Sequence, residues 1–428
     1  MAKAARPFGS YLRSESAAMN TAEIPLSTLR TIAAAPHRLL FFVGATNVLL
    51  AMSWWAWWLA TARWGTGVPR LPVPGGWMHA IVMQYQVLPA FMFGFLLTVF
   101  PRWMSLPPLG RQHYIPVGIG LFGGQLSTLA GLAGIADSQT SIETGALMTT
   151  AGWLIGTVLL VRLAWQESGL TWHAISCSFA LAFGLLGLAL YSCYLFNGDS
   201  RAMFAAIKLG TFAVLLPIYF TVCHRMIPFF ASAALPGYQM FRPMWTLSTL
   251  WAGALVHTWL ELGHGYAWLW VVDAPLAIMT AWLLWRWWPR GGSMPALLRV
   301  LFIGFAWLPI AFALYAVQSV WFATTSEFVL GRAPAHALFI GFFGSLLVAM
   351  VTRVTQGHSG RPLVLGDVAA FAFILLQAVA LTRIVAEFAP DSLRAQAVAA
   401  LGWIIAFAPW VLRSTWIYLT PRADGARG

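Results

Sequence analysis

The sequence predicts an all-α membrane protein with about twelve transmembrane helices. Of its 428 residues, 60% are hydrophobic and only 9% are charged, whereas a soluble domain carries roughly 25% charged residues. Most of the exterior must therefore face lipid. The apolar residues come in blocks of about 20, the length that an α-helix needs to cross a hydrocarbon core of roughly 30 Å. These blocks are too long for barrel strands and lack their alternating pattern.

Each apolar block is an expected span, and short polar loops separate the blocks. The first block is too long for a signal-peptide core and is followed by more membrane, so we expect it to be retained as a helix. The chain then divides into an N-terminal tail (1–36), a twelve-helix transmembrane domain (37–420) and a C-terminal tail (421–428). The expected spans are 39–62, 77–100, 114–134, 142–165, 172–196, 202–223, 244–262, 266–288, 296–318, 334–356, 366–388 and 395–419.

Basic residues are distributed unequally between the two sides of these spans. Of the 25 Lys and Arg residues, eighteen fall on the side of the N-terminus and six on the other side. Cytoplasmic loops carry the excess of Lys and Arg, so this asymmetry predicts that both tails are cytoplasmic and that the number of spans is even. The net charge of +12 has the same origin. The basic residues do not cluster on a soluble domain, so nucleic acid is not an expected partner.

Three spans end alike on the cytoplasmic side. The second ends in TVFPRWMSLPPLG (98–110), the sixth in TVCHRMIPFFASAALPG (221–237) and the tenth in VTRVTQGHSGRPLVLG (351–366). Each leaves the membrane through an Arg and then reaches Pro and Gly, and each lies four spans after the last. The pattern suggests three units of four helices. The alternative is convergence, because any cytoplasmic helix end attracts Arg and Pro.

The Arg and His residues of these three ends are expected to have a structural or docking role. Arg side chains repel metal cations, and they bind carbonyls, carboxylates and lipid phosphates well. His224 and Arg225 are expected to face the same cluster as the motif on the tenth span. The residues concerned are Arg102, His224, Arg225, Arg353, His358 and Arg361.

Histidines on the opposite side of the membrane are better candidates for metal ligands, because ionisable residues within a membrane are costly and usually functional. His79 opens the second span and His336 opens the tenth, and each is followed by Ala. Both spans run in the same direction, so the two imidazoles are expected at equal depth, as bis-imidazole haem ligation requires. The positive end of each helix also helps to keep them unprotonated. The alternative is two interfacial histidines satisfied by water or carbonyls.

The seventh span carries a second set of candidate ligands. His257, Glu261 and His264 are spaced i, i+4 and i+7, so they share one helical face. Imidazoles with a carboxylate suit copper, iron or zinc. The alternative is an ordinary polar helix end, because His264 lies at a very short loop. Lys208 and Asp273 fall in the same layer. They either neutralise each other, or Lys208 meets an anionic group such as a haem propionate.

At these residues the chain resembles the NnrS family of haem- and copper-containing membrane proteins, which is linked to bacterial responses to nitric oxide. Three segments carry the resemblance, and their order and helix placement match across most of the chain. They are MHAIVMQYQVLPAFMFGFLLTVFPRWMSLPPL (78–109), HRMIPFF (224–230) and PAHALFIGFFGSLLVAMVTRVTQGHSGRPL (334–363). The resemblance implies an inner-membrane protein with haem b, with copper, and with nitric oxide or a nitrosylated small molecule as a partner.

The chain departs from the family pattern at three positions. Many members read His-Ala-His-Glu at the start of the second span, where this chain has Ile81 and Val82 in place of the second His and the Glu. Many also carry a His in the ninth span, where this chain has Phe302. A second metal site is therefore in doubt. The haem-copper oxidases offer a fold-level analogy, with twelve helices in three arcs and a low-spin haem held by the second and tenth helices.

The leading hypothesis is a haem b protein of the nitric oxide response. His79 and His336 would be the axial ligands, and Arg70, Arg332 and Lys208 would lie within reach of the propionates. An oxidase-type binuclear centre is not expected, because the sixth span has only Lys208 in the membrane and His224 at its other end. The alternatives are a twelve-helix secondary transporter without haem and a cofactor-free scaffold. The sequence does not decide whether the protein is an enzyme.

Overall fold

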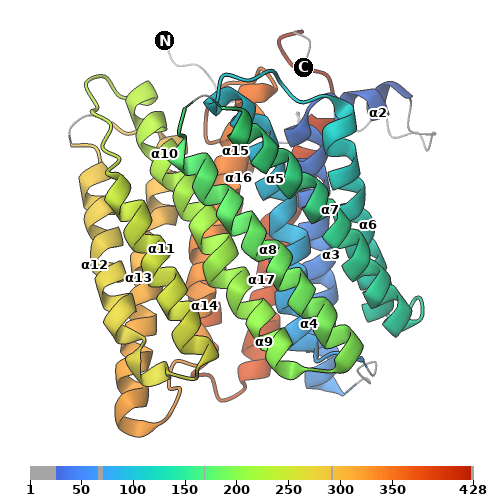
Figure 1. The fold of residues 1–428 in the computed structure, drawn as a ribbon, viewed down its shortest axis with the longest axis vertical. Coiled ribbons are helices and arrows are strands. Elements are labelled where there is room, and N and C mark those ends of the chain that lie inside the picture. The colour runs from blue at the N-terminus through green and yellow to red at the C-terminus, as the bar shows by residue number, and fades with distance from the viewer. Residues whose placement is uncertain (1–25, 66–70, 168, 291–292, 426–428) are drawn as a thin grey trace, which may run out of the picture.

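The computed structural model describes residues 26–65, 71–167, 169–290 and 293–425, which fold into helices joined by loops, without a strand. Eleven helices of this part are long and apolar enough to cross a membrane. A further helix, α11 (Met244–Leu262), lies in the bundle where the seventh span was expected. The fold is therefore the predicted all-α membrane bundle (Figure 1).

Three of the spans are composite, because a π-helical segment interrupts each of them. They are the second (α4 Gly75–Ile81, η2 Val82–Val87, α5 Leu88–Trp103), the sixth (α9 Ser200–Leu209, η3 Gly210–Leu215, α10 Leu216–Ala234) and the tenth (α14 Ala333–His336, η5 Ala337–Gly344, α15 Ser345–His358). The others are α3 (Pro36–Trp64), α6 (Arg111–Leu132), α7 (Ser138–Gln166), α8 (Trp172–Asn197), η4 with α12 (Tyr266–Trp268, Trp270–Trp287), α13 (Ala296–Thr325), α16 (Asp367–Val385) and α17 (Ser392–Leu419).

The first and last spans begin and end on the same side of the bundle, as an even number of crossings requires. Arg38, near the start of α3, donates from Nη1 to the carbonyls of Tyr418 and Thr420 at 3.3 and 2.8 Å. We call this side the termini end, and the opposite side, where α4, α9 and α14 lie (Figure 1), the far end. The assignment of the termini end to the cytoplasm stays a prediction.

Several span boundaries differ from the expected ones, and the largest difference is at the end of the sixth span. The sixth span was expected to end at 223 but continues to Ala234. The longer helix brings Phe230 under the Arg353 guanidinium of α15, with 4.1 Å between the guanidinium carbon and the ring centre. The predicted N-terminal tail also ends in a short helix, α2 (Leu26–Ile32). The Tyr114 hydroxyl of α6 donates to the Ala33 carbonyl just after it, at 2.8 Å.

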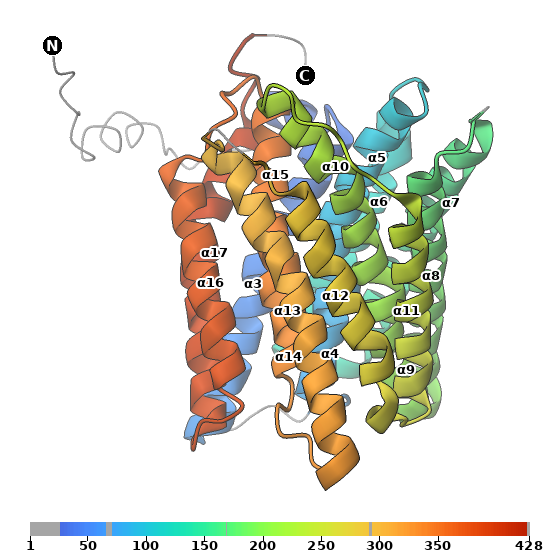
Figure 2. The same ribbon diagram turned by 90° about the vertical axis from the view of Figure 1, so that its left-hand side faces the viewer.

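The three composite spans form the centre of the bundle, and we call them the inner helices. Their most apolar stretches are 94%, 72% and 78% buried for the second, sixth and tenth spans, against 33–61% for the other eight candidate spans. Figure 2 shows α4, α10, α14 and α15 behind or between the outer helices. The inner helices are spaced four apart in the sequence, which is the spacing that the repeated helix ends predict.

Proline accounts for part of the π-helical irregularity. Pro89 and Pro217 each stand second in the helix that follows a π segment. A proline nitrogen cannot donate to the carbonyl four residues earlier, so the helix must find another arrangement there. The freed carbonyl of Tyr85 instead accepts the Trp153 indole N–H at 2.8 Å. The tenth span has no proline at this point, and its π segment ends at Gly344.

The three repeated helix ends meet in a closed ring at the termini end. Each end contributes an Arg that contacts an aromatic or imidazole ring on another inner helix. Arg102 lies 3.3 Å from His358, Arg353 stacks over Phe230, and Arg225 stacks over Trp103 at 4.4 Å. The contacts run from the second span to the tenth, from the tenth to the sixth and from the sixth back to the second. The Arg ring, as we name these six residues, supports the three-unit interpretation of the sequence.

Candidate functional site

His79 and His336 both lie at the far end, each on an inner helix. His79 sits in α4 and His336 closes α14, and both side chains are half-buried. The starts of the two helices are adjacent, because a Cβ on Gly76 would lie 3.7 Å from Nη1 of Arg332. The two residues that the sequence paired by depth therefore both lie at the far end, and their meeting at one haem stays a prediction.

The hydrogen bonds of the two rings leave nitrogen atoms available. Nδ1 of His336 lies 2.9 Å from the Arg332 carbonyl. A carbonyl only accepts, so Nδ1 carries the proton and Nε2 keeps a free lone pair. The His79 ring lies flat against Trp55, with 4.4 Å between ring centres and 8° between planes. Neither of its nitrogens has a hydrogen-bond partner within the described residues.

Positive charge borders this pair. The exposed Arg332 guanidinium forms no ion pair within the described part of the chain. Arg383 lies close by on α16, but it is paired with Glu387 at 2.5 Å. Arg70 lies outside the described residues. One unpaired guanidinium beside two imidazoles favours an anionic group at this place.

Lys208, Glu261, His257 and Asp273 form a buried chain of charges beside the pair. Lys208 Nζ lies 2.5 Å from Glu261 Oε2, and Glu261 Oε1 lies 3.5 Å from His257 Nε2. Asp273 Oδ1 bonds His257 Nδ1 at 2.8 Å, and both of these side chains are fully buried. The expectation that Lys208 and Asp273 neutralise each other is wrong, because each already has a nearer partner of opposite charge.

A cavity of about 340 Å³ connects this chain with the neighbourhood of His336. Lys208 and Glu261 line one part of it, and Arg332 and Ala335 line another. Tyr315 and Phe322 supply apolar wall. Lys208 therefore faces the same space as Arg332, as the sequence-based assignment of both to one anionic ligand requires.

The predicted copper ligands do not converge on one point. His264 follows the end of α11 in a left-handed conformation (φ 55°), and its Nδ1 lies 2.9 Å from the Tyr266 hydroxyl. His257 is held by Asp273, and Glu261 by Lys208. Among the described residues, no group of three or more His, Cys, Asp or Glu side chains is arranged to hold a metal ion. As placed, these three residues do not fit a copper ion.

The histidines of the termini end are bonded differently. His224 Nε2 lies 3.2 Å from the Pro243 carbonyl, and His224 Nδ1 lies 2.9 Å from His173 Nε2. Arg225 Nη1 reaches His173 Nδ1 at 3.5 Å. The carbonyl fixes the direction of the whole chain, from Arg225 through His173 and His224 to Pro243. His224 and Arg225 therefore join His173, and Arg225 touches the Arg353 cluster only through the Arg ring.

The rest of the motif on the tenth span also packs against protein. His358 lies 4.3 Å from His37 between ring centres, and its carbonyl accepts from Arg422 Nη1 at 3.0 Å. The Arg361 guanidinium stacks over Trp416 at 5.3 Å. These contacts agree with a structural role, which stays a prediction.

Sequence reasoning missed three residues of these sites. Trp55 lies in a run of four tryptophans between 54 and 58, and the sequence does not show which of them meets His79. His173 has no motif around it. Asp273 was noticed, but its contact with His257 was not among the alternatives that the sequence offered. The family departures sit in packed surroundings, since Ile81, Val82 and Phe302 are all buried, and Phe302 packs on Trp288 near the termini end.

Comparison with known families gives one match. The family described as NnrS protein matches residues 31–422, which is nearly the whole chain. None of the curated proteins compared matches it.

Proposed function

This chain belongs to the NnrS family, and we propose that it is a haem b protein of the bacterial inner membrane that contributes to the response or resistance to nitric oxide. His79 and His336 are the proposed axial ligands. The observation that carries the proposal is the His336 ring. Its Nδ1 is fixed by the Arg332 carbonyl at 2.9 Å, which leaves Nε2 as a neutral, oriented donor atom.

That arrangement is the one in which protein imidazoles bind metals. A hydrogen bond from one ring nitrogen to a carbonyl sets the tautomer, holds the ring plane and makes the other nitrogen a better ligand. His79 is oriented by another means, because the Trp55 ring lies flat against it. Both residues lie at the N-terminal ends of helices, where the helix dipole opposes protonation. The residues present therefore fit a bis-imidazole site.

The charges around the pair suit the propionates of a haem. Arg332 is unpaired, and Lys208 lines the cavity that reaches it. Arg332 would neutralise a carboxylate placed at the far end, whereas Glu261 already balances the charge of Lys208. Apolar side chains lie further inward on the same helices, including Phe339 and Phe343, whose rings are 5.4 Å apart. The cations thus lie toward the far end and the phenylalanine rings toward the centre of the bundle. A haem has the same arrangement, with charged propionates at one edge of an apolar porphyrin.

A haem held by His79 and His336 would supply electron transfer. The residues of this chain then have defined tasks. The Arg332 carbonyl holds the His336 proton on Nδ1, and Trp55 covers one face of the His79 ring.

Two single variants test the haem proposal. His79→Ala and His336→Ala should each abolish the low-spin bis-histidine spectrum of the purified protein, because either loss removes one axial ligand. The matched control is His264→Ala, which removes a far-end histidine that bonds only Tyr266. Haem content is measured as the pyridine haemochrome, and folding by size-exclusion chromatography. An unchanged spectrum in either test variant would end the proposal.

The nitric oxide role is tested in cells. A strain that depends on this protein should lose growth under nitric oxide when it carries His336→Ala, and should keep it with His264→Ala. A colourless preparation from cells with ample haem would instead favour the transporter alternative. Copper stays a weaker part of the proposal, since the three candidate ligands are engaged elsewhere. Stoichiometric copper that survives His257→Ala would exclude His257 as a ligand.

A further inference from the structure

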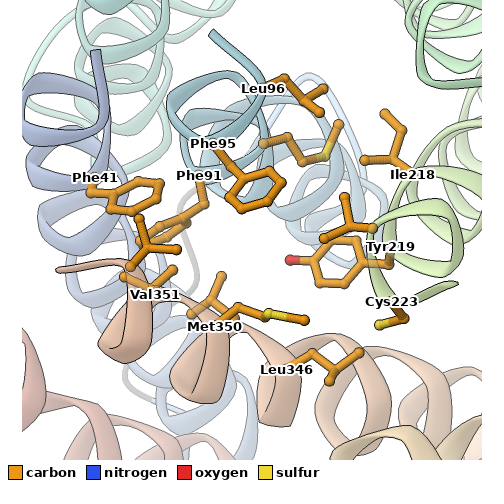
Figure 3. A pocket seen from close by; sticks show the side chains of 14 residues that line it. Phe41, Phe91, Phe95, Leu96, Ile218, Tyr219, Cys223, Leu346, Met350 and Val351 are labelled. Carbon is orange, nitrogen blue, oxygen red and sulfur yellow. The ribbon is translucent and has the colours of Figure 1, made fainter. Parts of the chain in front are cut away.

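A second cavity lies at the centre of the bundle, between the π segments and the Arg ring. Its volume is about 60 Å³, and α3 and all three inner helices line it. Figure 3 shows Phe91 and Phe95 from one side, Ile218, Tyr219 and Cys223 from another, and Leu346, Met350 and Val351 from a third. We call it the central chamber. It contains neither His79 nor His336.

Residues at equivalent positions of the three inner helices line the chamber. Counting back from the Arg of each repeated end, the residues seven and six positions earlier line the cavity in every case. The three arginines stand at equivalent places in the Arg ring. The lining of the chamber therefore follows the same spacing as the three repeated helix ends. The six equivalent residues are Phe95, Leu96, Ile218, Tyr219, Leu346 and Leu347.

Tyr219 is the one polar member of this set of six. Its hydroxyl points into the open centre of the chamber (Figure 3), and it has no hydrogen-bond partner among the described residues. Leaving a phenol hydroxyl unpaired in an apolar interior is unfavourable. Its ring is held from behind by Phe343, at 4.6 Å between centres. The hydroxyl is thus presented to the chamber.

The size and the lining define the occupant. A water molecule needs roughly 15 Å³ by this measure of volume and two to four polar partners, so a chamber of 60 Å³ with one hydroxyl is poorly suited to water. Cavities lined by Leu, Ile and Phe stay dry and take up apolar solutes such as xenon. The inner helices are the most buried of the candidate spans, so the chamber lies among the least lipid-exposed helices of the bundle.

We propose that the central chamber binds a small, neutral, apolar molecule of a few heavy atoms, and that Tyr219 donates a hydrogen bond to it. The protein would take such a solute from the membrane core, where apolar molecules concentrate. Cys223 contributes its thiol to the wall and needs no reaction for this role. The proposal is independent of haem ligation, because it uses a different part of the inner helices.

Xenon is the first probe. The full chain in lipid nanodiscs, kept reduced so that any low-spin haem is diamagnetic, should give a saturable bound-xenon signal in ¹²⁹Xe saturation-transfer NMR. Leu346→Phe fills the chamber and should remove this signal. Leu412→Phe makes the same change on an outward-facing position, where Leu412 is 68% exposed, and should leave it intact. No bound signal in the unsubstituted protein, or an equal signal in Leu346→Phe, would overturn the proposal.

The hydroxyl is tested with two molecules of nearly equal shape. Dimethyl ether has an acceptor oxygen and propane has none, and each is added as a competitor of xenon. The unsubstituted protein should prefer the ether, and Tyr219→Phe should reduce that preference about fivefold, the value of one ordinary hydrogen bond. If Leu346→Phe does not fold, this comparison decides alone. An unchanged preference in Tyr219→Phe would show that the hydroxyl makes no bond to the occupant.

Discussion

The two histidine pairs of this bundle differ in how their ring nitrogens are used. In the His173–His224 pair at the termini end, each of the four nitrogens has a neighbour within hydrogen-bonding distance. In the His79–His336 pair at the far end, one nitrogen is bonded and three are left over. Imidazoles whose nitrogens are all hydrogen-bonded stabilise the fold, whereas an imidazole that binds a metal needs a nitrogen with a free lone pair. The comparison therefore separates a structural pair from a candidate site.

His257 is the case that tests this distinction most strongly, since it lies at the far end yet is bonded on Nδ1 by Asp273. Asp273→Leu should destabilise the protein more than any other substitution considered, by about 3–5 kcal/mol, because it breaks a fully buried charge pair. Thermal unfolding in detergent measures this loss. Asp273→Asn keeps an acceptor and should recover part of it. A neutral effect of Asp273→Leu would mean that His257 is not held as a structural residue.

The termini-end pair should behave as part of the fold. His224→Ala leaves the His173 N–H and the Pro243 carbonyl unpaired and opens a gap in a buried site, at a cost of roughly 2–3 kcal/mol. Haem per folded protein should not change, in contrast to His79→Ala. His224→Gln retains a donor and an acceptor and should be milder. If His224→Ala instead removed haem from folded protein, the division between the two pairs would fail.

Much of the fold could be predicted because lipid simplifies the rules. Hydropathy and length located the helices, and the boundaries of α11 were predicted as observed, at 244 and 262. The end of the sixth span was missed because Pro228 and the polar residues beside it resemble a helix end. The helix continues because Phe230 and Ile227 are buried against neighbouring helices. Tertiary contacts of this kind leave no local signal.

The site was partly predictable for the same reason. Depth in the membrane follows from position along a span, so His79 and His336 could be paired from sequence alone. The direction in which a side chain points around the helix axis could not be predicted, because π segments rotate the helix that follows by amounts that the sequence does not show. The partners of Lys208 and Asp273 depend on that rotation, as does the meeting of Trp55 with His79. The predicted copper set failed to converge because His264 lies past the end of α11.

Arg332 sharpens the comparison further, because its carbonyl and its guanidinium have separate roles. Arg332→Gln keeps the carbonyl that orients His336 and removes the charge. Haem affinity should fall about tenfold through the loss of a charge-assisted contact, while the bis-histidine spectrum is retained. Titration of the apoprotein with haem measures the change. Arg201→Gln, at an exposed far-end arginine, is the control, and an equal loss there would indicate a general charge effect.

The smallest effect is expected at an ion pair that stands outside both clusters. Arg63 Nε lies 2.7 Å from Asp391 Oδ2, and the two side chains are 40% and 36% exposed. The Arg394 backbone N–H and the Arg63 guanidinium lower the pKa of Asp391 below its usual value. A lowered pKa stabilises the fold above the pKa of the unfolded chain, and this contribution is lost as the pH falls through the folded value.

Exposed pairs of this kind are worth little, because water and salt screen them. At pH 7, Asp391→Asn should therefore leave the unfolding temperature unchanged within error, and any small difference should vanish in acid. The buried Arg383–Glu387 pair gives the contrast, since Glu387→Gln leaves a guanidinium that is only 8% exposed without its partner. Differential scanning fluorimetry of both variants at pH 7 and pH 4 makes the measurement. A larger loss in Asp391→Asn than in Glu387→Gln would mean that burial does not rank the charges of the far end, and the argument from burial would then fail for its histidines as well.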